Sequence, residues 1–373
     1  MENLYRAFEL KSNFYCQWVL DFTELNDDWD WHEIIQQSLS SNPGASLKIK
    51  YFLFSKQWVA SNTPPPFQHI NHNGSLEDAL LNLPHNLSES GPSCDVIKLT
   101  YTTGVAIAFR TLHSVMDGKG LWNWLTDCIK IINETTPTGH SAKINDRELG
   151  KQLSTVAGRK DFHRVTPLTD GFVDKPREFF SFTIPGTAKG LSKKLCFILR
   201  NYAEKHGVEK LLFLLPSDLR KYDNTIHSTG NLTGILTVPC HKDSSDKEIS
   251  EALKQQIQHK EDAQYTQQAY FWRYFSVKSW GKSLFRQQRD DNYSSTAVIS
   301  NIGDLDASEI TIKGQQPTNA FCMAPYSNYH PLFIVSTSYQ NQLTLHFAIP
   351  EKLQGNAEEL VNFVKSQLLE DKF

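Results

Sequence analysis

The sequence lacks most of the patterns that assign a protein to a functional class. Its six cysteines never occur at C-x-x-C spacing, so we predict neither a zinc ribbon nor a disulfide framework, and reduced thiols in the cytoplasm are the simplest interpretation. No stretch approaches the roughly 18–20 apolar residues that cross a bilayer. The first residues also lack a basic start followed by an apolar run. We therefore expect no membrane span and no signal peptide.

An excess of charge of one sign is also missing. The chain has 38 Lys and Arg against 41 Asp and Glu, a formal net charge of −3, and no long basic run. This balance argues against nucleic acid as a partner, and with no apolar span we expect no membrane partner either. Hydrophobic residues make up 39% and charged residues 21% of the 373 residues, which is typical of a globular cytoplasmic protein with one large or two ordinary domains.

Several catalytic signatures are absent as well. The sequence contains no G-x-S-x-G elbow, no P-loop and no G-x-G-x-x-G stretch, so the corresponding hydrolase and nucleotide-binding mechanisms have no support. His113 and Asp117 are a potential pair of metal ligands, but no third ligand is evident nearby. We therefore predict no metal site.

What is present is an alternation of strands and helices in both halves. In the first half, strands are predicted at 13–22, 46–54, 57–61, 95–101 and 104–113, and helices from 30 to the Pro-Gly stop at 43–44, at 74–83 and at 121–132. In the second half, strands are predicted at 178–186, 210–222, 234–240, 295–306, 319–325, 331–339 and 342–349, and helices at 191–207, 246–258, 262–289 and 355–373. Residues 134–176 have little apolar periodicity and are interpreted as a crossover between the halves.

The stretch "RTLHSVMDGKG" at 110–120 carries the most chemistry. It ends a strand whose unbroken apolar run predicts a central position, buried on both faces. A histidine near pH 7 is mostly neutral and can accept a proton, so His113 is a candidate general base. If 113–117 formed a helical turn, Asp117 would share a face with His113 and orient it. If they formed an irregular turn, Asp117 would point away and pair with a cation. Gly118 permits a positive φ or a close backbone approach.

A structural role is the main alternative for each of these residues. A histidine at a strand end is more often a hydrogen-bonded structural residue than a base, and the H-x-x-x-D-G spacing is short enough to arise by chance. The motif alone does not establish catalysis.

At "HSVMDG" the sequence resembles the chloramphenicol acetyltransferase-like superfamily, which includes plant BAHD acyltransferases, alcohol acyltransferases and nonribosomal peptide synthetase condensation domains. Two further stretches follow in the order of that superfamily. "LLPSDLRKYDNTIHSTGN" at 214–231 resembles its D/N-L-R strand with the later G-N, and "AVISNIGDLD" at 297–306 resembles its S-N-x-G strand. The resemblance covers nearly the whole chain.

The resemblance implies a role for each site residue. Arg220 would form an ion pair with Asp117, so that Asp117 is structural and fixes the loop that presents the catalytic His113. Ser300 and Asn301 would lie across a channel from His113 and stabilise the oxyanion of the tetrahedral intermediate, with the backbone amide of Gly118 as a further candidate. Each stretch also has an ordinary structural interpretation, a surface arginine in the first case and a strand ending in a turn in the second.

The resemblance also implies an architecture. We expect an α/β (α+β type) fold with two lobes, each a mixed and mainly antiparallel sheet flanked by helices. Residues 1–165 would form the lobe with the H-x-x-x-D-G motif, and residues 166–373 the lobe with the D-L-R and S-N-x-G strands. The channel would run between the lobes with His113 midway. Because one chain would then complete the channel, a monomer is expected.

The implied activity is acyl transfer from a thioester to a hydroxyl or amine of a small molecule, in secondary metabolism. Acyl-CoA is the favoured donor and an acyl carrier protein the other, as co-substrates rather than bound cofactors. The alternatives are a free-standing condensation-type enzyme that uses a carrier-bound donor, and a catalytically silent relative that binds a carrier or another partner. Two departures from the family patterns prevent assignment to a subfamily. Leu112 stands where condensation domains have a second histidine, and residues 310–317 do not match the D-F-G-W-G stretch of the plant enzymes.

Overall fold

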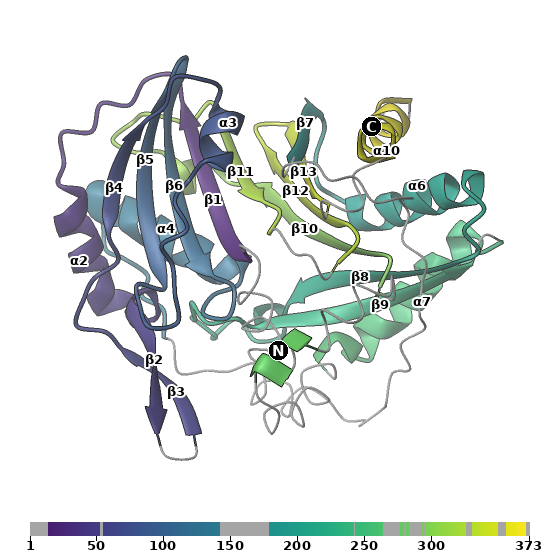
Figure 1. The fold of residues 1–373 in the computed structure, drawn as a ribbon, viewed down its shortest axis with the longest axis horizontal. Coiled ribbons are helices and arrows are strands. Elements are labelled where there is room, and N and C mark those ends of the chain that lie inside the picture. Colours follow the sequence, from purple (N-terminus) through teal and green to yellow (C-terminus); the bar gives the residue numbers. More distant parts are fainter. Residues whose placement is uncertain are drawn as a thin grey trace.

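The computed structural model describes residues 14–52, 55–141, 179–241, 243–263, 277–279, 281–282, 293, 295–325, 330–349 and 356–370, with the backbone alone at 52, 55 and 56. Within these ranges the chain forms two lobes, each with a sheet and flanking helices (Figure 1). The predicted two-lobed α/β fold is therefore confirmed.

The first lobe is built on a five-stranded sheet in the order β11-β1-β6-β5-β4. All neighbours are antiparallel except β4 and β5. Its strands are β1 (Tyr15–Phe22), β4 (Phe67–Asn71), β5 (Cys94–Tyr101), β6 (Gly104–Leu112) and β11 (Asn319–Met323). Its helices are α2 (Trp31–Ser41), α3 (Leu76–Leu81) and α4 (Gly118–Ile132), and η1 (Pro43–Ser46) leads into a separate hairpin of β2 (Leu47–Phe52) and β3 (Ser55–Ala60).

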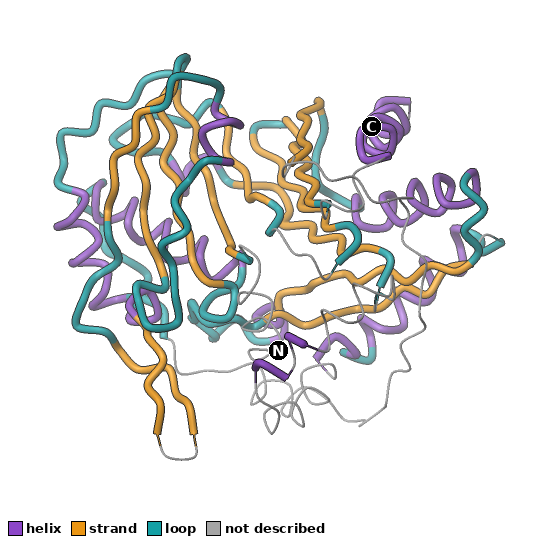
Figure 2. The backbone as a smooth tube through the Cα atoms, viewed as in Figure 1, coloured by secondary structure: helices purple, strands orange, loops and turns teal. Residues whose placement is uncertain are grey.

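The second lobe is built on a six-stranded sheet in the order β7-β13-β12-β10-β8-β9, in which β10 runs parallel to both β12 and β8. Its strands are β7 (Phe179–Pro185), β8 (Lys210–Asp218), β9 (Thr233–His241), β10 (Ala297–Leu305), β12 (Phe333–Tyr339) and β13 (Gln342–Ala348). Its helices are α6 (Leu191–Lys205), α7 (Asp246–Gln258) and α10 (Ala357–Glu370), with the short η2 (Leu219–Tyr222) and η4 (Ala307–Ile310). The alternation of these elements is visible in Figure 2.

Two local predictions were wrong. The strand β4 lies between the strand predicted at 57–61 and the helix predicted at 74–83, where no strand was predicted. Its five residues, FQHIN, show neither clear alternation nor an apolar run. The strand predicted at 210–222 stops at Asp218, because the Asp218 carboxylate accepts a hydrogen bond from the backbone N–H of Arg220 and starts a 3₁₀ turn.

Helix ends follow the sequence signals closely. Ser245 and Glu248 form a reciprocal capping box at the start of α7, which satisfies two otherwise unpaired backbone donors. Past the end of α6, Gly207 has φ +71, a conformation that glycine adopts without steric cost.

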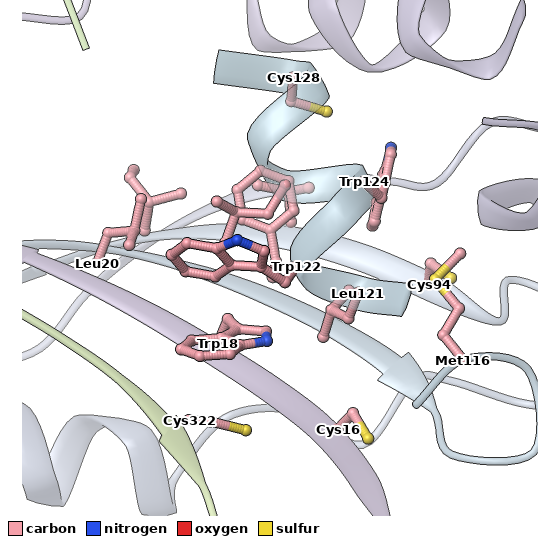
Figure 3. Packing of buried hydrophobic residues seen from close by; sticks show 14 of the residues in the cluster. Cys16, Trp18, Leu20, Cys94, Met116, Leu121, Trp122, Trp124, Cys128 and Cys322 are labelled. Carbon is pink, nitrogen blue, oxygen red and sulfur yellow. The ribbon is translucent and has the colours of Figure 1, made fainter. Parts of the chain in front are cut away.

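One hydrophobic cluster joins the two lobes. Figure 3 shows its centre, where Trp18 of β1 faces Trp122 of α4 with ring centroids 4.6 Å apart. Phe333 and Val335 of β12 belong to the same cluster, so burial of apolar surface holds the lobes together. All six cysteines are free and buried.

The lobes are not two separate halves of the sequence. The strand β11 follows most of the second lobe in the chain, yet it pairs with β1 and completes the first sheet. The proposed boundary between 165 and 166, most of the crossover at 134–176 and most of the helix at 262–289 lie outside the described residues. Within the described part of the chain, no helix has the length and apolar character needed to cross a bilayer.

Candidate active site

His113 stands directly after the central strand β6, in a turn that leads into α4. The backbone N–H groups of Val115 and Met116 both donate to the carbonyl of Leu112, which closes the turn. Asp117 has an extended backbone (φ −84, ψ 178) and acts as the N-cap of α4. Residues 113–117 are therefore not a helical turn, and this geometry decides between the two arrangements that the spacing left open.

The imidazole of His113 is packed against the first strand. Its ring stacks on Phe14 with centroids 5.0 Å apart and an interplanar angle of 18°. Its backbone N–H also donates to the carbonyl of Phe14 at 3.3 Å. The ring position is thus fixed from the N-terminal side of β1.

Asn231, in the segment before β9 of the second lobe, contacts the same histidine. Its Nδ2 donates to the backbone carbonyl of His113 at 2.6 Å and lies 3.2 Å from the ring Nδ1. Its Oδ1 accepts from the backbone N–H of Thr233 at 3.2 Å, which fixes the orientation of the amide. A residue of the second lobe therefore holds the His113 loop of the first.

The electrostatics of His113 favour its neutral form. Burial lowers the pKa of the imidazole below 6.5, opposed by a hydrogen bond from the ring to the residue's own carbonyl and by the nearby Asp117 carboxylate. A neutral imidazole carries its proton on one ring nitrogen and a lone pair on the other. The neutral ring of His113 therefore has one nitrogen that can accept a proton.

Asp117 and Arg220 form a buried ion pair between the lobes. The side chains are 6% and 7% exposed. Arg220 donates from Nη1 to Oδ2 of Asp117 at 3.0 Å and from Nη2 to Oδ1 at 3.2 Å. Asp117 also accepts from the backbone N–H of Gly120 at 2.7 Å and of Leu232 at 2.7 Å. The carboxylate is therefore fully engaged and turned away from the His113 ring.

The guanidinium also organises the segment at 228–231. Arg220 donates from Nε to the carbonyl of Ser228 at 3.1 Å and from Nη2 to that of Gly230. Nη1 reaches the carboxylate of Asp218 at 2.7 Å as well. The same arginine thus holds Asp117 and the backbone that carries Asn231, so the two supports of the His113 loop are coupled.

The two glycines of the motif have different steric requirements. A Cβ at Gly118 would meet only Cδ1 of Ile302, at 3.4 Å. A Cβ at Gly120 would lie 2.1 Å from the carbonyl oxygen of Thr229, which is impossible without backbone movement. The backbone of Gly118 does not adopt a positive φ. Its carbonyl accepts a hydrogen bond from Nε1 of Trp18 at 2.8 Å. The close backbone approach expected at Gly118 occurs at Gly120.

The structure places Ser300 and Asn301 on opposite faces of β10. Val298 packs in the cluster shared by the lobes and Ile299 in the core of the second lobe. Ser300 shares the face of Val298 because side chains alternate along a strand. Asn301 donates to the carbonyl of Ala188 at 2.7 Å and accepts from Ser336 at 3.1 Å. Its amide is thus used within the second lobe, whereas Ser300 faces the first.

The structure shows no cluster of three or more His, Cys, Asp or Glu side chains suited to a metal ion in the ranges it describes. Three contributors to the site were missed by sequence reasoning. Phe14 is one of many aromatic residues and directly precedes β1, and Gly120 is one glycine among nineteen. Asn231 was quoted only as part of the G-N stretch, and nothing in the spacing of 113 and 231 shows that the two residues meet.

Comparisons with known proteins identify the fold. No family model matches the chain, and no curated protein matches it in sequence. Solved structures do match. The starter condensation domain of rhizomide synthetase RzmA, as a mutant in complex with C8-CoA, is 12% identical with a TM-score of 0.66, over 99% of this chain and 93% of that one. TRI101 of F. sporotrichioides, complexed with coenzyme A and T-2, is 12% identical with a TM-score of 0.63, over 98% of each chain.

Both neighbours match along almost their entire length, and both have the architecture that the sequence motifs implied. The chain therefore shares the two-lobed fold of the rhizomide synthetase starter condensation domain and of TRI101.

Proposed function

We propose that this protein transfers an acyl group from a thioester, with acyl-CoA as the favoured donor, to a hydroxyl or amine of a small molecule. The observation that carries the proposal is His113: a partly buried histidine with a lowered pKa, placed at the junction of the lobes and held by Phe14 and Asn231. The CoA complexes of the two structural neighbours support the choice of donor.

In the proposed mechanism, His113 acts as general base. Nε2 removes the proton of the acceptor hydroxyl or amine as the acceptor oxygen or nitrogen attacks the thioester carbonyl. The resulting imidazolium then gives that proton to the departing thiolate. Atoms and charge balance without a covalent enzyme intermediate, metal or bound cofactor.

The oxyanion of the tetrahedral intermediate needs a hydrogen-bond donor in a site shielded from water. Ser300 is the preferred donor, because it lies on the face of β10 that meets the first lobe. The amide of Gly118, at the positive N-terminal end of α4, is the second candidate. The Asn301 amide donates to the carbonyl of Ala188 and is therefore not placed as an oxyanion donor. Its role would be to hold β10, and with it Ser300, in position. We place the channel for both substrates between the lobes.

A carrier-bound donor is the second candidate function. Its support is the likeness to a condensation domain of a synthetase, the starter condensation domain of rhizomide synthetase, with 12% identity and a TM-score of 0.65. That domain has been solved with C8-CoA and Leu-SNAC, in which the acyl group is on CoA, so the first candidate remains the favoured one. The two donors are distinguished by supplying the same acyl group either as its CoA thioester or on a loaded carrier protein. Turnover with acyl-CoA alone identifies the first function.

The test replaces His113 by alanine and measures thioester consumption with a panel of acyl-CoAs and pooled alcohols and amines. Loss of the base should lower the rate by about 100-fold or more, with the fold retained. His32, exposed on α2, gives a matched control variant, His32→Ala, that should keep the wild-type rate. Equal rates for His113→Ala and wild type would remove His113 as the base. No turnover of any CoA or carrier thioester would leave a silent binding protein.

A further inference from the structure

Helix α4 carries a buried amide and a buried carboxylate, Asn123 and Asp127, in a largely apolar stretch. Figure 3 shows the apolar side chains of the same helix packed in the cluster that joins the lobes. Gly120, Asn123 and Asp127 are spaced by three and then four residues, so they lie on one face of the helix. We call these three residues the polar stripe of α4. Because buried polar groups need hydrogen-bond partners, the partners of the stripe indicate its role.

The first two members of the stripe contact the second-lobe segment that leads to Asn231. Gly120 approaches it so closely that a Cβ would lie 2.1 Å from the carbonyl oxygen of Thr229. One turn later, Nδ2 of Asn123 donates to the carbonyl of Ser228 at 3.2 Å. Two consecutive residues, shortly before Asn231 in the chain, are therefore placed against α4.

The third member of the stripe holds the segment 138–141, which follows α4 in the chain. The Asp127 carboxylate accepts hydrogen bonds from the backbone N–H of Thr138 at 2.8 Å and of Gly139 at 2.9 Å. Its Oδ2 also lies 3.0 Å from Nδ1 of His140. One carboxylate thus binds three consecutive residues of this segment.

The segment 138–141 in turn pairs with the second lobe. The backbone N–H of Ser141 donates to the carbonyl of His227 at 2.9 Å, and the Ser141 carbonyl accepts from the N–H of Thr229 at 3.2 Å. These two bonds form a parallel bridge between Ser141 and Ser228. Asp127 therefore reaches, through the 138–141 segment, the same residues that Asn123 reaches directly.

We infer that Asn123 and Asp127 are positioning residues for His113 and act through Asn231. Asn231 lies two residues after Thr229 and donates to the carbonyl of His113 at 2.6 Å, so the place of its backbone decides where its amide meets the loop. The inference rests on the proposed function for the task of His113. A misplacement of about 1 Å caused by a distant residue can cost about 100-fold in rate.

The test follows the His113 ring by NMR in protein with labelled histidines, with His113→Gln to assign its signals. Asn231→Ala is the reference: the loop loses its support, water reaches the ring, and the pKa of His113 rises towards 6.5. Asn123→Ala and Asp127→Asn should change the same signals and raise the same pKa. Removal of the Asp127 charge would by itself lower the pKa of a histidine, so a rise reports position.

The double variant Asn123→Ala/Asn231→Ala tests whether the effect passes through Asn231. It should move the His113 pKa no further than Asn231→Ala alone, because the second change removes the group through which the first acts. Asn123→Ala and Asp127→Asn are independent, so either one decides the question if the other does not fold.

Ser38→Ala is the matched control. It removes another buried hydrogen bond to α4, the one that Nε1 of Trp124 donates to Ser38 at 2.9 Å, on the side of the helix that meets α2. It should lower stability to urea as Asn123→Ala does, yet leave the His113 signals as in wild type.

Three outcomes would overturn the inference: wild-type His113 signals in both stripe variants, additive shifts in the double variant, or equal shifts in Ser38→Ala. The ring measurements need no turnover. A failure of the proposed acyl transfer would therefore appear as an inactive wild type, separately from a failure of the positioning role. Once turnover is established, Asn123→Ala should lower kcat by about 10-fold to 100-fold with little change in KM.

Discussion

At the scale of single residues, the two glycines of the motif give a sharp contrast. Gly120→Ala would drive a Cβ into the backbone carbonyl of Thr229, so we expect it to lower the free energy of unfolding by about 1–3 kcal/mol or more. Gly118→Ala meets only a flexible isoleucine methyl group and should change stability by less than about 1 kcal/mol. Urea unfolding of both variants beside wild type measures the difference. A more damaging change at Gly118 than at Gly120 would contradict this account.

The glycine result shows how far residue-level prediction reaches. The motif correctly directed attention to the turn after β6, because a histidine and an acid at a strand end are visible in the sequence. It did not identify the glycine that must stay small, because the contact that decides this comes from Thr229 in the other lobe. Asn231 was not predicted for the same reason, because its contact with His113 also joins the two lobes. Local sequence shows which groups are present, whereas tertiary packing decides which of them meet.

At the scale of elements, the main prediction concerns the ion pair between Asp117, at the start of α4, and Arg220 of η2. Asp117→Ala would leave the buried Arg220 guanidinium with only the partly exposed Asp218 carboxylate, and would also remove the acceptor of the Gly120 and Leu232 N–H groups. We expect a cost of about 3–5 kcal/mol in unfolding free energy. The double variant Asp117→Leu/Arg220→Met removes both charges and should cost clearly less than the sum of the two single changes. Asp243→Ala, an exposed carboxylate, is the control. The two single changes are Asp117→Leu and Arg220→Met. Denaturant unfolding checks all five variants; an Asp117→Ala protein as stable as wild type would exclude this ion pair as a source of stability.

Most elements could be predicted because apolar periodicity and caps are local properties. The helix at 246–258 was predicted with its observed bounds, since the residues of its capping box and of its apolar stripe all lie within one short stretch of sequence. The strand β4 was missed, because an edge strand with one parallel neighbour has a weak pattern of its own. Its pairing with β5 supplies the stability that its sequence does not signal.

At the scale of the whole molecule, the path of β11 is the feature that the sequence could not show. A strand at 319–325 was expected, but its partner β1 lies some 300 residues earlier. No local pattern records such a pairing. The family resemblance, in contrast, correctly predicted the two-lobed fold, because it rests on the order of motifs along the whole chain and not on the pattern of one segment.

Two buried histidines, His330 and His346, make the whole molecule sensitive to acid. Burial lowers the pKa of His330 and of His346 to about 4 each, whereas a histidine in the unfolded chain titrates near 6.5. Between these values the unfolded state binds more protons, so stability falls as the pH drops from 6.5 towards 4. Each histidine should contribute a loss of about 2 kcal/mol between pH 7.5 and pH 5.

The variant His346→Phe isolates one of these contributions. A phenylalanine keeps the ring stacked on Phe321, where the centroids are now 4.7 Å apart, but it cannot take up a proton. The loss of stability between pH 7.5 and pH 5 should therefore shrink by about 2 kcal/mol relative to wild type, as measured by urea unfolding at both pH values. His32→Gln, exposed on α2, should leave the wild-type difference unchanged. If His346→Phe loses as much stability as wild type over this interval, the buried imidazole is not the source of the acid sensitivity.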